Sequence, residues 1–129
     1  MTVAHFSRFL ILFALAAIPL TFGQEEAQTI QGWLSDEACA RSRATSGTYT
    51  NTNPECARKC VAEGKKIVLI APEERKVLAV TNQDMAKSNV GNYVEVKGTI
   101  DTKNETVEIK ALKMLEEGRA ACSAPRKKT

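Results

Sequence analysis

Histidine is nearly absent from this chain. Its one copy, His5, lies in a short polar start before an apolar run from Phe9 to Phe22. A polar start, an apolar run too short to span a bilayer and small residues before a cut at Gln24 are typical of a secretory signal peptide. We therefore expect residues 1–23 to be a signal peptide, and the mature protein to be periplasmic or secreted and to lack histidine.

The missing imidazole excludes much chemistry from the mature protein. Histidine is the commonest general base near neutral pH, and it activates serine and cysteine nucleophiles. It also supplies ligands to many zinc sites. We therefore expect a protein that is not an enzyme and that carries no cofactor.

The chain also lacks a large excess of positive or negative charge. The chain has 18 basic and 15 acidic residues, giving a net charge of +3, and Arg8 is the only charged residue of the leader. Only residues 125–128 form a basic block. We therefore expect no nucleic-acid partner, no membrane association after cleavage, one domain over residues 24–115, and a flexible basic tail over residues 116–129.

Five segments alternate between apolar and polar residues, or are rich in β-branched residues, as strands do. They are residues 29–35, 65–71, 75–81, 92–100 and 105–115. In the last segment the alternation slips, which predicts a β-bulge near Ala111. Residues 36–53 lack apolar periodicity and are expected to be irregular.

Two helices are expected between these strands. Asn53 is a good N-cap and Pro54 suits the first helical position, so a helix is predicted over residues 54–63. A shorter helix is predicted over residues 82–89. The expected fold is mainly β: an OB-fold-like, partly open barrel of five strands, with a loop-helix insertion between strands 1 and 2 and a short helix between strands 3 and 4.

Several motifs add a resemblance. The run GWLSDEAC ending at Cys39, the later CARKCV from Cys56 to Val61, and the closing VEVKGTID and ETVEIKALKML resemble a group of small exported bacterial OB-fold-like proteins of uncharacterised function. The resemblance covers Ile30 to Leu115 and implies the same fold and an exported location. Members often carry His or Met between the first two cysteines, whereas residues 40–54 contain neither, which weakens metal binding here.

The four cysteines are Cys39, Cys56, Cys60 and Cys122. In an exported domain of this size we expect them to form disulfides. Cys56 and Cys60 lie on successive turns of one helix, which suits a mutual disulfide poorly. We therefore expect Cys39 to pair with Cys60 or, alternatively, with Cys56, and prefer Cys60 because the segment before the helix can then wrap back across it. The pairing stays open.

A different function for the cysteines is also open. Cys39, Cys56 and Cys60 could act in thiol redox exchange or could bind a soft metal such as zinc or copper(I). The role of Cys122 is not given by the sequence.

A ligand face is the remaining candidate site. Trp33 falls on the face of its strand opposite the core, and with Asp36, Tyr49 and Tyr93 it forms the possible ligand face. Asp36 could be a general base, but a cap at the strand end is the more ordinary role. We expect a binding module for an unknown protein or small-molecule partner; its oligomeric state does not follow from the sequence.

Overall fold

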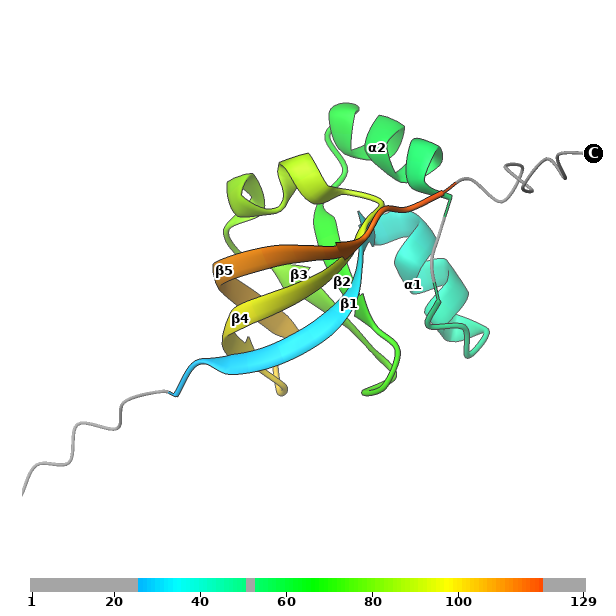
Figure 1. Cartoon of the computed structure of the whole chain (residues 1–129). Helices are drawn as coiled ribbons and strands as arrows, with labels where there is room; N and C mark the ends of the chain where they lie inside the picture. The colour runs from blue at the N-terminus through cyan, green and yellow to red at the C-terminus, as the bar shows by residue number, and fades with distance from the viewer. Residues whose placement is uncertain (1–25, 51–52, 120–129) are drawn as a thin grey trace, which may run out of the picture.

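The structure is a computed structural model that describes residues 26–50 and 53–119 (Figure 1). The expected signal peptide, its cut at Gln24 and Cys122 lie outside the described residues. No helix in the described ranges is long and apolar enough to cross a membrane.

Five strands form the frame of the molecule, and the mainly β prediction is confirmed. They are β1 (Gln28–Asp36), β2 (Ile67–Ala71), β3 (Lys76–Val80), β4 (Tyr93–Asp101) and β5 (Thr106–Glu116). Their order is β1-β2-β3-β5-β4, and β4 pairs back with β1, so the mixed sheet closes into a ring. The expectation of a partly open arrangement is therefore corrected, because every strand has a partner on both sides over part of its length. All neighbours are antiparallel except β3 and β5.

Apolar side chains that alternate along the strands fill the interior of the ring, because every second residue of a strand points to the same face. This inner cluster contains, among others, Ile30, Leu34, Ile67, Leu69, Leu78, Val94, Val96, Val107 and Ile109. In β2 all five residues are buried, so this strand is covered on both faces. A continuous apolar run is what such a strand requires.

Two amide side chains extend the ring where β3 ends. β3 pairs with β5 at only two register positions. The Gln83 amide accepts from the Ile67 N–H (2.7 Å) and donates to the Ile67 carbonyl (3.0 Å), beside β2. The Asn82 amide accepts from the Ile109 N–H (2.9 Å) and donates to the Ile109 carbonyl (2.7 Å), beside β5. These side chains replace the backbone partners that a longer β3 would supply.

The segment after β1 corrects the prediction of an irregular 36–53. It contains the helix α1 (Glu37–Thr45), for which Asp36 is the N-cap, accepting from the Cys39 N–H at 3.0 Å. The expected role of Asp36 as a cap at the strand end is therefore confirmed. The helix was missed because it packs through small side chains, Ala40 and Ala44, which leave little apolar periodicity.

A second helix, α2 (Pro54–Ala62), begins as predicted. The Asn53 side chain accepts from the backbone N–H groups of Glu55 (3.0 Å) and Cys56 (3.2 Å). Figure 1 shows α2 near one end of the ring, and buried Ala57 joins the inner cluster there. The short helix expected over residues 82–89 is two 3-10 turns, η1 (Gln83–Met85) and η2 (Lys87–Asn89).

The predicted bulge in the last strand is confirmed. Lys97 is opposite Ala111, whereas the next residue, Gly98, is opposite Ile109, so Lys110 is the extra residue. β5 ends at Glu116, one residue into the segment expected as a tail. Beyond it, the Gly118 N–H donates to Asn92 Oδ1 at 3.1 Å.

Candidate functional site

A second, smaller apolar cluster lies outside the ring, between α1 and the outer faces of β1, β2 and β3. Its buried members are Ala40, Val68, Ile70 and Val77, with Trp33, Ala44 and Tyr49 packed around them. We call it the outer cluster. It explains the position of Trp33 on the face opposite the core: the indole packs against this cluster instead of remaining exposed.

Of the three aromatic residues expected on the ligand face, two border this cluster and the third, Tyr93, lies against Trp33. The Trp33 and Tyr93 rings lie with their centroids 5.0 Å apart at an interplanar angle of 52°, and Trp33 and Tyr49 both border the outer cluster. Burial raises the pKa of Tyr93, and the negative charges of Glu73, Glu74 and Glu116 raise it further. Tyr93 is therefore a neutral phenol at physiological pH.

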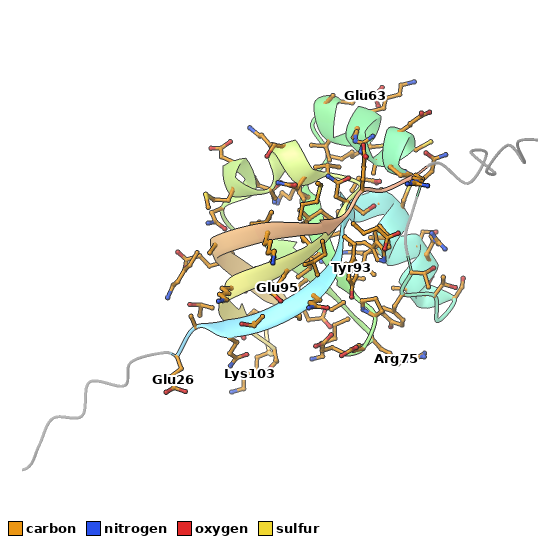
Figure 2. The ribbon with its side chains drawn as sticks, viewed as in Figure 1. Glu26, Glu63, Arg75, Tyr93, Glu95 and Lys103 are labelled. Carbon is orange, nitrogen blue, oxygen red and sulfur yellow. The ribbon has the colours of Figure 1, made fainter. Side chains whose placement is uncertain are left out.

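A hollow of about 320 Å³ opens beside the outer cluster. Its walls include Arg41, Ala44, Tyr49, Arg75, Lys76 and Glu105. We call it the α1 groove. It lies between α1, the start of β3 and the turn between β4 and β5, and Figure 2 shows Arg75 projecting from the tip of the β2–β3 hairpin on the same side as α1.

Positive charge dominates the α1 groove. The guanidinium of Arg75 lies over the Tyr49 ring, 5.2 Å from its centroid. Within the described part of the chain, neither Arg75 nor Lys76 forms an ion pair with a carboxylate. Arg41 does: its Nε contacts Glu37 Oε1 at 2.9 Å, and its Nη1 lies 3.9 Å from Glu105 Oε2.

Two residues of this groove have an unusual backbone conformation. Arg75 and Glu105 both have φ of 52°, and they are the two non-glycine residues with positive φ in the described ranges. Side chains other than glycine, asparagine and aspartate rarely adopt this left-handed region, and such residues often mark functional sites. Both line the same groove from different turns, at a cost to stability in each.

The cysteines form a separate cluster near the start of α1. Cys39 and Cys60 are half-buried and Cys56 is exposed, and none of the three is paired with another. Burial raises the pKa of the Cys39 thiol, and so do the charge and hydrogen bonding of Asp36, followed by Cys60 and then Cys56. Cys60 and Cys56 therefore both lie within electrostatic reach of Cys39, and the Cys39 thiol is held in its protonated form.

Metal binding was expected only as an alternative use of these three cysteines. In the part of the chain that the structure describes, no three His, Cys, Asp or Glu side chains are placed to hold a metal ion. The alternative ligand set of Cys39, Cys56 and Cys60 therefore does not form a coordination site in this arrangement.

Asp36 was expected on the ligand face, but its side chain is fully buried. One oxygen caps α1, and the other, Oδ1, is a buried side-chain atom with no hydrogen-bond partner. Asp36 therefore cannot meet a ligand at the surface. Its place is inside the junction between β1 and α1, where its charge acts on Cys39.

Four charged groove residues were missed from the sequence: Arg41, Arg75, Lys76 and Glu105. They come from α1, from two turns and from the start of β3, which are far apart along the chain, so no local pattern joins them. The left-handed backbone at Arg75 and Glu105 could not be predicted from the sequence either, because the usual signal for it is glycine or asparagine.

These features define a mainly β ring protein with a basic surface groove under its first helix. Comparison of the chain with models of protein families, with characterised proteins and with solved structures gave no match. The resemblance to small exported OB-fold-like proteins therefore stays a prediction.

Proposed function

We propose that this chain is an exported, non-enzymatic binding module with an OB-fold-like barrel, and that the α1 groove is its ligand site. The strand order, the parallel β3–β5 pair and the short contact between those strands support this fold. OB-folds bind ligands over strands 2 and 3, between the connection of strands 1 and 2 and the connection of strands 4 and 5.

The position of the α1 groove is the observation that carries the proposal. Arg41 and Tyr49 come from the β1–β2 connection, Lys76 begins β3, and Glu105 ends the β4–β5 turn. The three elements expected around an OB-fold ligand thus meet at one hollow. Its volume of about 320 Å³ suits a small molecule or one or two units of a larger ligand.

The test is to map ligand binding onto the folded chain. Residues 24–129, labelled with nitrogen-15, are titrated with neutral and charged sugars, nucleotides and short peptides while amide resonances are recorded. We expect saturable shifts centred on α1 and the two turns. Thr45→Trp, which fills the exposed rim of the groove, should abolish them, whereas Ser88→Trp on η2 should not. Saturable binding that Thr45→Trp leaves unchanged contradicts the proposed site.

The cysteines have a supporting role in this proposal. We propose that Cys39 and Cys60 form a disulfide in the exported protein and tie α1 to α2. The larger influence of Cys60 than of Cys56 on the Cys39 pKa supports this choice. The disulfide requires the two side chains to move together, since they are unpaired in the structure.

Thiol redox exchange or soft-metal binding through Cys39, Cys56 and Cys60 is the second candidate function. It is favoured by the nearness of Cys60 and Cys56 to Cys39, and opposed by the raised pKa of Cys39, because the thiolate is the reactive form. Thiol titration and intact mass of the exported protein, before and after reduction, separate the two. A stable disulfide without metal favours the binding module, and reactive free thiols or bound zinc or copper favour the second candidate.

A further inference from the structure

We propose that the α1 groove binds an oxyanion, a carboxylate or a phosphate group, between Arg75, Lys76 and Arg41. This inference rests on the proposed function, because it names the ligand chemistry of the same groove. The groove walls carry three cations and one carboxylate, that of Glu105. A neutral ligand would leave these positive charges without an oppositely charged partner.

The cations differ in how far they are already engaged. Arg41 is held by Glu37 at 2.9 Å and reaches toward Glu105 at 3.9 Å, so part of its charge is balanced. Arg75 and Lys76 have no carboxylate partner in the described part of the chain. These two adjacent residues are therefore the primary anion contacts, and Arg41 is an auxiliary one.

Arg75 is also oriented in advance. Its guanidinium rests against the Tyr49 ring, and the left-handed backbone fixes the direction in which the side chain leaves the turn. A planar guanidinium presents paired N–H donors that match the two oxygens of a carboxylate or phosphate. Stacking on an aromatic face reduces the freedom that binding would otherwise remove.

Glu105 is the internal competitor of the ligand. Its carboxylate lines the same groove and faces Arg41 across it. A bound oxyanion would meet like-charge repulsion from Glu105, so removing this charge should strengthen binding. Removing the charge of Arg75 and removing the charge of Glu105 should therefore change the affinity for the ligand in opposite directions.

The first experiment titrates the mature chain with inorganic phosphate and with glucuronate, each at constant ionic strength, following backbone and arginine Nε–H resonances. Chloride, added as sodium chloride, is the control anion. We expect saturable shifts at Arg75 and α1, with a dissociation constant on the order of 1 mM for a single group. Binding by phosphate only, by glucuronate only or by both supports the proposal and identifies the source of the oxyanion.

Matched variants then test the residues. Arg75→Gln should weaken binding at least tenfold, and Arg75→Lys, which keeps the charge but loses the planar fork, should have a smaller effect. Glu105→Gln should tighten binding several-fold. Lys97→Gln, which removes a cation from an exposed site on β4, should leave it unchanged. Dispersed amide spectra of every variant establish that it is folded.

Three results would overturn the inference: no saturable shift with either anion, an equal response to chloride, or binding that Arg75→Gln leaves intact. If a neutral sugar or peptide binds in the groove while neither oxyanion does, this inference fails and the proposed function stands. If Thr45→Trp blocks none of the ligands that bind the chain, the proposed function fails as well.

Discussion

The two faces of β2 bury similar side chains in different settings. Leu69 points into the ring, where the inner cluster surrounds it on all sides. Ile70, its neighbour, points outward into the outer cluster, which holds only four buried residues, one of them from α1 itself. Alternate residues of one strand thus support the frame and the candidate site separately.

The difference indicates where stability and function reside. The inner cluster is shared by all five strands, so its loss affects the whole domain. The outer cluster holds α1 in place, and α1 carries Arg41 of the groove and Cys39 of the cysteine cluster. Changes to the outer cluster should therefore disturb the site before they disturb the ring.

Leu69→Ala should have the largest effect. Removing this fully buried side chain from the inner cluster should destabilise the domain by about 3–5 kcal/mol, because the cavity cannot be filled by its neighbours. Urea unfolding followed by circular dichroism measures it. A loss well under 2 kcal/mol, on the order of that for a half-exposed residue, would contradict the central place of the inner cluster.

Ile70→Ala should cost less, about 2–3 kcal/mol, since the outer cluster is small and bordered by half-buried side chains that can move in. Its effect should also be local. Hydrogen exchange should show lost protection in α1 while amides of β4 and β5 keep theirs. Equal loss throughout the chain would show that the two clusters form one cooperative unit.

Arg75→Gly and Glu105→Gly should each stabilise the fold by about 0.5–1 kcal/mol, because glycine adopts positive φ without strain. Their effects on oxyanion binding should be opposite: the first weakens it, the second strengthens it. Thermal unfolding and the phosphate titration together measure this. If both variants are less stable than the parent, the left-handed conformation is not strained.

Asp36→Asn should have the smallest effect on stability but a clear effect on Cys39. The charge of Asp36 raises the Cys39 pKa, so its removal should lower that pKa and speed alkylation at mildly alkaline pH. The rate is measured against pH in a Cys56→Ser, Cys60→Ser background. An unchanged profile would show that burial alone holds the thiol protonated.

The raised pKa of Cys39 also predicts how the stability of the reduced protein changes with pH. A thiol whose pKa is higher in the folded state than in the unfolded state stabilises the fold below its ordinary pKa near 9.0. This contribution is lost as the pH rises through the raised value. Asp36→Asn should therefore reduce the loss of stability seen on going from neutral to alkaline pH.

Most strands could be predicted because burial on one face imposes a period of two, and β2 because a strand buried on both faces is a continuous apolar run. The bulge near Ala111 could be predicted because the period of two fails there. The N-cap at Asn53 could also be predicted, since helix capping depends on residues that are close together in the sequence. Helix α1 was not, because the side chains it buries, Ala40 and Ala44, are too small to produce a clear apolar stripe. Helix propensity alone is a weak signal for so short a segment.

The candidate site was predicted only in part. Trp33, Tyr49 and Tyr93 were named as parts of one possible ligand face. Trp33 and Tyr49 border the outer cluster and Tyr93 contacts Trp33, but only Tyr49 of the three lines the α1 groove. Asp36 was expected beside them but is buried. The groove cations were missed because it is ring closure that brings the turn at Arg75 close to α1 and Glu105, and long-range contacts of this kind leave no local trace.

The amide side chains of Asn82 and Gln83 limit where a partner could pair with the sheet. Each strand of the ring has two neighbours, and these amides occupy backbone groups at Ile109 and Ile67 where β3 stops short. At these two positions an extended peptide finds no free backbone group to which it could add as a further strand, a route that many domains use both for recognition and for fibril growth. At the end of β3, edge pairing is therefore blocked by two amides that act as surrogate peptide bonds.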